Sequence, residues 1–156
     1  MTFRLPHSRR DEAPIPVPAI GLELRVRLPG AVSRGVCTII ETTNARGFGP
    51  PLHRHREVEV FHVLEGRYLF EVDGERFHAD VGDVVAVPGG AARAFVNVTD
   101  RPARQFILIL PALDAVAFFT GPAEVMAGGP ADQTARQAFG RQWGVEFLGP
   151  PLAATG

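Results

Sequence analysis

Short runs of β-branched and alternating apolar residues, divided by turn signals, fill the middle of this 156-residue chain. The runs cover residues 22–28, 36–43, 58–64, 67–72, 75–79, 84–87, 93–98 and 104–110. Turn signals stand between them at Pro29-Gly30, Asp73-Gly74 and Pro88-Gly89-Gly90. Asp-Gly between alternating runs is a strong hairpin signal. Short strands at this close spacing predict an all-β sandwich or barrel rather than a bundle of helices.

The segments on either side of this β-rich region have a different character. Residues 1–20 combine charged residues with a Pro-x-Pro-x-Pro run, so we expect an extended arm that is loose or laid against a neighbour. Residues 21–111 are predicted to form the barrel domain. Residues 112–156 are predicted to form a helical extension packed on the barrel, with helices at 113–119 and 131–143 separated by Gly/Pro breaks.

Composition excludes several classes of protein. The formal net charge of -1 gives no electrostatic attraction toward nucleic acid, so no nucleic-acid partner is expected. No apolar run approaches the roughly 18 residues of a membrane span, and the N-terminus has no apolar signal region. A single cysteine, Cys37, excludes an internal disulfide and agrees with a reducing compartment. We therefore expect a cytoplasmic protein without a membrane partner.

Two imidazoles and a carboxylate follow one another at His53, His55 and Glu59. Such ligands suit divalent first-row metals such as Fe, Ni, Mn, Zn and Cu, and three donors leave coordination positions open. On a straight strand the three side chains would share one face, but Glu59 would lie roughly 13 Å beyond His55. Because each ligand of an ion lies about 2.1 Å from it, the chain has to bend near Arg56-Glu57 if these residues share a metal.

The same segment resembles the first motif of the cupin family, which reads Gly, five residues, His-x-His, three or four residues, Glu, six residues, Gly. Gly47, His53, His55, Glu59 and Gly66 fill this motif without a gap. The resemblance implies a cupin-type double-stranded β-helix, which is a jelly-roll barrel. It also implies a divalent metal cofactor held inside the barrel by the two histidines and the glutamate.

A second cupin motif reads Gly, five residues, Pro-x-Gly, two residues, His, three residues, Asn. Gly82, Pro88, Gly90 and Asn97 match it, but Arg93 stands where the motif has its metal-ligand histidine. The expectation of a barrel therefore stands, whereas the four-ligand metal site is broken.

Arg93 leaves three interpretations open. In the first, the three remaining donors hold the metal as in non-haem Fe(II) oxygenases, and Arg93 binds an anionic substrate at the pocket wall. In the second, the guanidinium replaces the metal and pairs with Glu59, because a permanent cation beside a divalent ion is unfavourable at low dielectric. In the third, Arg93 points to solvent and His62 or His78 supplies the fourth ligand. Strand parity weakens the third, because it puts His62 and Glu59 on opposite faces.

The resemblance covers about residues 36–110, and the helical tail also looks like the C-terminal extension of single-domain bacterial cupins of the quercetin-dioxygenase-like group. It implies a metal-dependent, dioxygenase-like enzyme acting on a small organic substrate, aromatic or anionic. Glu59 or a neighbouring base would take the substrate proton. The alternative is a non-catalytic small-molecule-binding cupin without a bound metal, in which Arg93 holds an anionic ligand. An isomerase or a lyase would use the same pocket. Because a sandwich leaves exposed sheet edges, we also expect a homodimer.

Simpler structural roles are open for several of these residues. The His53 and His55 segment, beside two arginines, would otherwise be a solvated basic loop, and Glu57 is expected to be a surface charge. The aromatic residues expected in the core are Phe61, Phe70, Phe77, Phe95 and Phe106. If they line the barrel, they also offer an apolar pocket to a hydrophobic ligand. His78 is expected at the surface, and Trp143 is expected to anchor the last helix.

Overall fold

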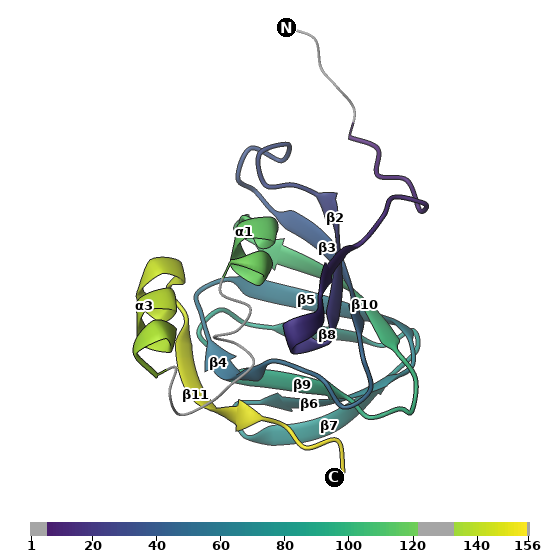
Figure 1. Ribbon diagram of the computed structural model, residues 1–156, viewed down its shortest axis with the longest axis vertical. Coiled ribbons are helices and arrows are strands. Elements are labelled where there is room, and N and C mark those ends of the chain that lie inside the picture. The colour runs from purple at the N-terminus through teal and green to yellow at the C-terminus, as the bar shows by residue number, and fades with distance from the viewer. Residues whose placement is uncertain (1–5, 122–132, 156) are drawn as a thin grey trace, which may run out of the picture.

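Two antiparallel sheets face each other and enclose the core, and the helices lie together on one side (Figure 1). The computed structural model describes residues 6–121 and 133–155. Within these residues no helix is long and apolar enough to cross a membrane. The arrangement confirms the predicted all-β architecture with a short helical tail.

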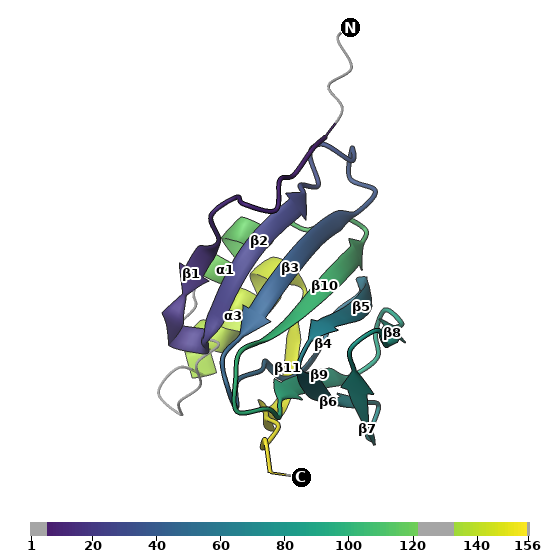
Figure 2. The ribbon, with the colours of Figure 1, turned by 90° about the vertical axis from the view of Figure 1, so that its right-hand side faces the viewer.

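The first sheet has six strands in the order β1-β2-β3-β10-β5-β8, and Figure 2 looks across it from β1 to β8. Its strands are β1 (Ile15–Val17), β2 (Leu22–Leu28), β3 (Thr38–Asn44), β10 (Ala103–Leu110), β5 (Val58–Glu65) and β8 (Val84–Val87). The second sheet has five strands in the order β11-β4-β9-β6-β7. Its strands are β11 (Glu146–Pro151), β4 (Pro51–Arg54), β9 (Arg93–Asn97), β6 (Arg67–Val72) and β7 (Glu75–Asp80).

The strands of the β-rich region agree closely with the predicted runs. β2, β6 and β8 have the predicted bounds, β3 begins two residues later and ends one residue later than predicted, and the other predicted strands differ by one residue at one end. The predicted hairpin is confirmed, because β6 and β7 pair with Val72 opposite Glu75. Its turn residues, Asp73 and Gly74, both have positive φ, as a two-residue hairpin loop of type I′ requires.

Three short strands, β1, β4 and β11, were not among the predicted runs. β1 belongs to the segment expected to be an extended arm, yet it pairs antiparallel with β2. β11 pairs antiparallel with β4, with Phe147 opposite His53. All three are short and proline-containing or proline-flanked. Proline is depleted in strands and confined to sheet edges or strand ends, so the usual strand pattern is weak there.

Among the described residues, two helices follow the last barrel strand, as predicted. They are α1 (Ala115–Thr120) and α3 (Gln133–Trp143), and a short 3-10 helix, η1 (Pro18–Ile20), precedes β2. Residues 131 and 132, the predicted start of the second helix, lie outside the described residues. The ring of Phe118 in α1 packs on Phe139 and Trp143 of α3, with centroid distances of 5.2 and 5.4 Å. Trp143 therefore anchors the last helix, as expected.

The core between the sheets contains Phe61, Phe70 and Phe95, which are buried as predicted. The ring of Phe61 meets those of Phe70 and Phe95 edge-on, at centroid distances of 5.2 and 5.5 Å. Phe77 is only partly buried and stacks on Phe70. For Phe106 the prediction is wrong, because β10 alternates strictly and Phe106 lies on the face opposite its buried residues.

The turn after β8 packs against the chain between β4 and β5. A Cβ atom on Gly89 would lie only 2.1 Å from the carbonyl oxygen of Arg56, so no side chain fits there. The N–H of the next residue, Gly90, donates to the carbonyl oxygen of His55 at 2.8 Å. The turn of the second motif therefore supports the backbone of the first.

Candidate metal centre and its cavity

The chain between His53 and Glu59 crosses from one sheet to the other. His53 lies on β4 in the five-stranded sheet, and Glu59 lies on β5 in the six-stranded sheet. Residues 55–57 connect the two strands, which confirms the predicted bend near Arg56-Glu57. The bend brings together side chains that a straight strand would hold far apart.

The three predicted metal ligands converge. Ligand atoms of His53, His55 and Glu59 all lie within 4.8 Å of one another. His55 Nε2 lies 2.8 Å from Glu59 Oε1, and the two imidazole centroids are 5.4 Å apart. Atoms spaced in this way can share an ion that lies about 2.1 Å from each. All three side chains line an internal cavity, so the interpretation as a solvated basic loop is wrong.

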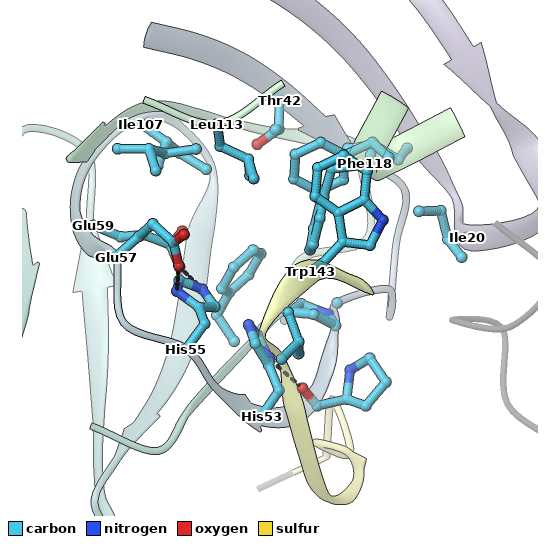
Figure 3. Close-up of a pocket in the computed structure, with 18 of the residues that line it drawn as sticks. Ile20, Thr42, His53, His55, Glu57, Glu59, Ile107, Leu113, Phe118 and Trp143 are labelled. Carbon is cyan, nitrogen blue, oxygen red and sulfur yellow. Dashed lines mark hydrogen bonds and ion pairs between the residues drawn. The ribbon is translucent and has the colours of Figure 1, made fainter. Parts of the chain in front are cut away.

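The Nδ1 atoms of both histidines face acceptors. His53 Nδ1 lies 2.7 Å from the carbonyl oxygen of Pro51 (Figure 3). Because a carbonyl only accepts, this Nδ1 carries the proton and Nε2 offers its lone pair. His55 Nδ1 lies 3.0 Å from Glu57 Oε2, although the angle does not complete a hydrogen bond. Metal-binding histidines are usually oriented through their second nitrogen in this way, so the donor set fits a divalent metal ion.

Electrostatics keep His53 and Glu59 in the forms that bind metal. Burial lowers the pKa of His53 from 6.5 to about 4, so its imidazole is neutral at pH 7. Burial raises the pKa of Glu59, but the hydrogen bond from His55 and the charges of His55 and Arg93 outweigh it. The net pKa of Glu59 therefore lies below its ordinary value, and the carboxylate is ionised at neutral pH.

Arg93 is buried, with 2% of its surface exposed, and the protein binds its guanidinium on several sides. Nη1 donates to Glu59 Oε1 at 2.9 Å and to the carbonyl of Glu57 at 3.2 Å. Nε donates to the carbonyl of Ala91 at 3.2 Å, and Nη2 to that of Pro88 at 2.9 Å. Its ion pair with Glu59 is the contact that the second interpretation of this arginine expects.

The other two interpretations of Arg93 agree less well with this arrangement. The third is wrong, because Arg93 does not point to solvent. Neither His62 nor His78 belongs to the candidate metal cluster found among residues 6–121 and 133–155. His78 is exposed, as expected. For the first, Arg93 is not among the cavity-lining residues, so an anionic ligand would meet the guanidinium only if it left its partners. The anion-contact role stays a prediction that this geometry disfavours.

Glu57 is a functional candidate that the sequence pattern misplaced. It was expected to be a surface charge, but it is 6% exposed and lines the cavity. The bend between β4 and β5 turns its carboxylate inward, next to His55. The sequence did contain a signal for this position, because residues 57 and 59 are two apart and side chains two apart on a strand share one face.

The cavity has a polar end and an apolar end. The polar end is formed by His53, His55, Glu57 and Glu59. The cavity as a whole measures about 80 Å³ and opens partly to solvent. Figure 3 shows Phe118 and Trp143 across the cavity from His55, Glu57 and Glu59. The aromatic residues that line the cavity are Phe95, Phe118, Phe119, Trp143 and Phe147.

Most of these rings are not the ones expected. Of the phenylalanines predicted to line a pocket, only Phe95 does so. The others come from α1, the end of α3 and β11, in the segment expected only to pack on the barrel. The adjacent Phe118-Phe119 pair and the single tryptophan were visible in the sequence, but nothing in their spacing connects them with His53.

Comparisons with known proteins agree with the fold and with the location of the motifs. Residues 40–109, which span nearly all of β3 to β10, match the family described as cupin domain. No curated protein matches the chain significantly. The matched region contains both motifs and excludes α1, α3 and β11. Residues 40–109, a little under half of the chain, are therefore similar to a cupin domain in sequence as well as in fold.

Solved structures show the same barrel at low sequence identity. KdgF from Halomonas sp. is 17% identical with a TM-score of 0.62, over 70% of this chain and 96% of its own. An RmlC-like cupin from Shewanella frigidimarina is 19% identical with a TM-score of 0.61, over 70% and 93%. A predicted oxalate decarboxylase from Thermotoga maritima is 20% identical with a TM-score of 0.55, over 59% and 81%. Identities this low show the cupin fold alone, and the finer resemblance to the quercetin-dioxygenase-like group stays a prediction.

Proposed function

We propose that this chain is a metal-dependent, dioxygenase-like cupin enzyme acting on a small organic molecule bound in the cavity. The observation that carries the proposal is the convergence of His53, His55 and Glu59, within 4.8 Å of one another, at the polar end of an otherwise apolar cavity. Three protein donors leave coordination positions open to a ligand in that cavity.

His53 and His55, through Nε2, and the Glu59 carboxylate would hold the ion, which would be Fe, Ni, Mn, Zn or Cu. The ion would supply a Lewis acid and, if redox-active, a path for electrons from the bound substrate to dioxygen. Arg93 and His55 both contact Oε1 of Glu59, which fixes the direction of this carboxylate before any ligand arrives.

Glu57 is better placed than Glu59 to accept a proton from the substrate. Glu59 was the predicted base, but its lowered pKa and its pairing with Arg93 make it a weak one. The Glu57 carboxylate lies on the same cavity wall, and only its backbone carbonyl is bonded to Arg93. The apolar residues around both carboxylates would exclude water from the reacting molecule.

A second candidate is a non-catalytic binding protein that takes a small molecule without metal. The observation that favours it is the ion pair between Arg93 and Glu59 at 2.9 Å, which gives the buried carboxylate a permanent cationic partner. Isomerase or lyase chemistry at the same pocket is a further alternative to the dioxygenase-like reaction.

Metal analysis of protein purified without a metal-affinity tag separates the two candidates. The protein would be soaked with Fe(II), Ni(II), Mn(II) or Zn(II), desalted and assayed for bound metal. We expect close to one equivalent for at least one ion, and none in His53→Ala. The matched control, His62→Ala, removes a histidine outside the cluster and should bind metal normally. Occupancy that stays far below one equivalent with every ion would remove the oxygenase proposal.

Replacing Arg93 by histidine tests the same proposal from the opposite direction. Arg93→His restores the ligand type of the second motif, so metal affinity should rise, by about tenfold or more for one added good ligand. The measurement is competitive titration against a chelating dye. Unchanged affinity would mean that this position does not face the ion.

We also propose that two copies of the chain associate. β8 lies at one edge of the six-stranded sheet, and its Val84 is 62% exposed. Val58 on the adjacent strand β5 is 36% exposed, so apolar side chains gather beside a free strand edge. Light scattering coupled to size exclusion should give a dimer mass, and Val84→Lys should lower it. A monomer mass for the unaltered chain at micromolar concentration would contradict the proposal.

A further inference from the structure

The apolar end of the cavity is built by parts of the chain outside the cupin domain match. Phe118 and Phe119 belong to α1, Trp143 ends α3, and Phe147 lies on β11. These four residues are called the ring wall below. The ring wall lies across the cavity from the carboxylates, as Figure 3 shows for Phe118 and Trp143.

The ring wall packs against a buried residue that lies outside the cavity lining. Phe139 is 3% exposed and does not line the cavity, but its ring contacts three of the wall residues. Its centroid lies 5.2 Å from that of Phe118, 6.1 Å from that of Phe147 and 6.3 Å from that of Trp143. A wall fixed by packing needs little ordering when a ligand arrives, which favours binding.

Part of the aromatic surface remains uncovered. Phe119, Trp143 and Phe147 are only partly buried, although all three pack against the buried cluster around Phe139. Aromatic rings prefer edge-to-face or offset contact with another ring. A ligand that carries one ring would therefore gain more from this surface than an aliphatic ligand of the same size.

Without a bound ion, the polar end of the cavity disfavours anions. Glu57 and Glu59 present carboxylates there, and none of the cavity-lining residues in the described chain is Arg or Lys. Of the nearby cations, Arg93 is bonded to Glu59 and to backbone carbonyls, and Arg56, whose Nε lies 3.5 Å from Glu57 Oε1, is 81% exposed and does not line the cavity. A ligand carboxylate would thus face like charges, whereas a neutral hydroxyl can donate a hydrogen bond to a carboxylate.

The size of the cavity suits a ligand with a single ring. The cavity measures about 80 Å³ and is partly open. For comparison, a closed dry cavity of about 150 Å³ binds benzene. A single ring would fill this space and extend toward the opening of the cavity.

We infer that the cavity binds neutral, hydroxylated, single-ring aromatic molecules, with the ring against the ring wall and the hydroxyl toward Glu57 and Glu59. This inference rests on the proposed function, since it names the substrate class for the same cavity. The ring contacts and the hydroxyl contacts both come from the protein, so binding of the ring does not require the ion.

The only tryptophan of the chain, Trp143, lies in the ring wall and supplies a specific probe. Its indole N–H gives a single NMR cross-peak, which would be followed during titration of chelator-treated protein at pH 7 with phenol, cyclohexanol or benzoate. We expect a saturable shift with phenol. We expect affinity at least threefold weaker for cyclohexanol, which lacks the ring, and at least tenfold weaker for benzoate, which carries the charge.

A pair of matched variants tests whether the ring wall makes the difference. Phe119→Leu removes one partly buried ring from the wall, and Phe77→Leu removes a partly buried ring that stacks on Phe70 away from the cavity. One aromatic contact changes affinity by about two- to tenfold. Phenol should bind to Phe119→Leu more weakly by this factor, and to Phe77→Leu as to the unaltered protein.

The ranking of the three probes in the unaltered protein decides the outcome without any variant. No shift with phenol, or equal affinity for phenol and cyclohexanol, or benzoate binding as tightly as phenol, would overturn the inference. A parallel titration with Zn(II) keeps the two proposals separate. Zinc binding without phenol binding defeats the inference alone, and phenol binding without any metal binding defeats the proposed enzyme alone.

Discussion

The two ends of the cavity are built in different ways. The polar end comes from residues 53–59, a single stretch whose bend between β4 and β5 turns four side chains inward. The apolar end comes from α1, α3 and β11, which only long-range packing brings together. The first depends on local backbone geometry and buried charge, and the second on apolar contacts. Each end should therefore respond to its own mutations and leave the other intact.

The largest effect is expected at the polar end, from Arg93→Met. Methionine keeps most of the volume but leaves the Glu59 carboxylate buried without its cation. Breaking a buried pair in this way costs about 3–5 kcal/mol of the free energy of unfolding. Urea denaturation at pH 7 measures it, with Arg101→Met as a control because that side chain is 87% exposed.

Two further outcomes sharpen this prediction. Adding Glu59→Gln to Arg93→Met should restore part of the lost stability, since the uncompensated charge is then gone. A loss below about 1 kcal/mol for Arg93→Met would indicate that water reaches Glu59 freely, as at an exposed pair, and that the polar end is not the low-dielectric site described above.

Glu57→Ala should weaken metal binding without unfolding the protein. Glu57 Oε2 lies 3.0 Å from His55 Nδ1, where it would orient the ring of a metal-bound His55, and removing such a partner typically costs about 10- to 100-fold in metal affinity. Glu57→Gln, which keeps an acceptor oxygen, should show a smaller loss, and Glu75→Ala, at an exposed position, none. If Glu57→Ala bound metal as tightly as the unaltered protein, the orienting role would be excluded.

Stability should fall as the pH decreases from 6.5 toward 4. The pKa of His53 is 6.5 in the unfolded chain and about 4 in the folded protein. Between these values the unfolded chain binds a proton that the folded protein excludes, so the free energy of unfolding decreases as pH falls. Each pKa unit is worth about 1.4 kcal/mol. Because the ring is only partly buried on the cavity wall, we expect about 1–2 kcal/mol in total.

Urea denaturation between pH 7 and 4.5 measures this dependence, and two histidine variants test its origin. His53→Gln should flatten the curve, whereas His78→Gln, at an exposed position, should leave it unchanged. An equally steep curve in His53→Gln would assign the pH dependence to another group.

The smallest effect is expected at the apolar end, from Phe139→Leu. Leucine keeps the position apolar but loses the ring contacts with Phe118, Trp143 and Phe147. The free energy of unfolding should decrease by about 1 kcal/mol, and phenol affinity should decrease with it. Metal affinity should not change. A parallel loss of metal binding would show that the two ends are coupled, contrary to the comparison above.

The sequence revealed the polar end well because its chemistry is local. The spacing of His53, His55 and Glu59, with the geometric need for a bend, was sufficient to predict that these three candidate ligands converge. Glu57 was missed because a bend changes which side chains face inward, and parity along a straight strand does not describe it. The partners of Arg93 could not be predicted either. Three of its acceptors are backbone carbonyls, which every residue has and which no sequence pattern marks.

The barrel was predictable from strand length and turn chemistry, but the short strands that complete its edges were not. β4 and β11 contain prolines, and their pairing depends on each other rather than on a pattern within either. The ring wall was hidden for a related reason. Phe118 and Trp143 were correctly expected in helices, but which face of a helix meets a cavity depends on how the helix is packed.

The contact between Gly89 and the Arg56 carbonyl limits which substitutions the site can accept. Arg93 stands at the ligand position of the second motif, yet the turn of that motif packs against the backbone next to His55, with no space for even a methyl group on Gly89. A substitution at Gly89 would displace an imidazole that it never touches. The turn of the second motif can therefore support the backbone of the first motif whether or not position 93 binds a metal.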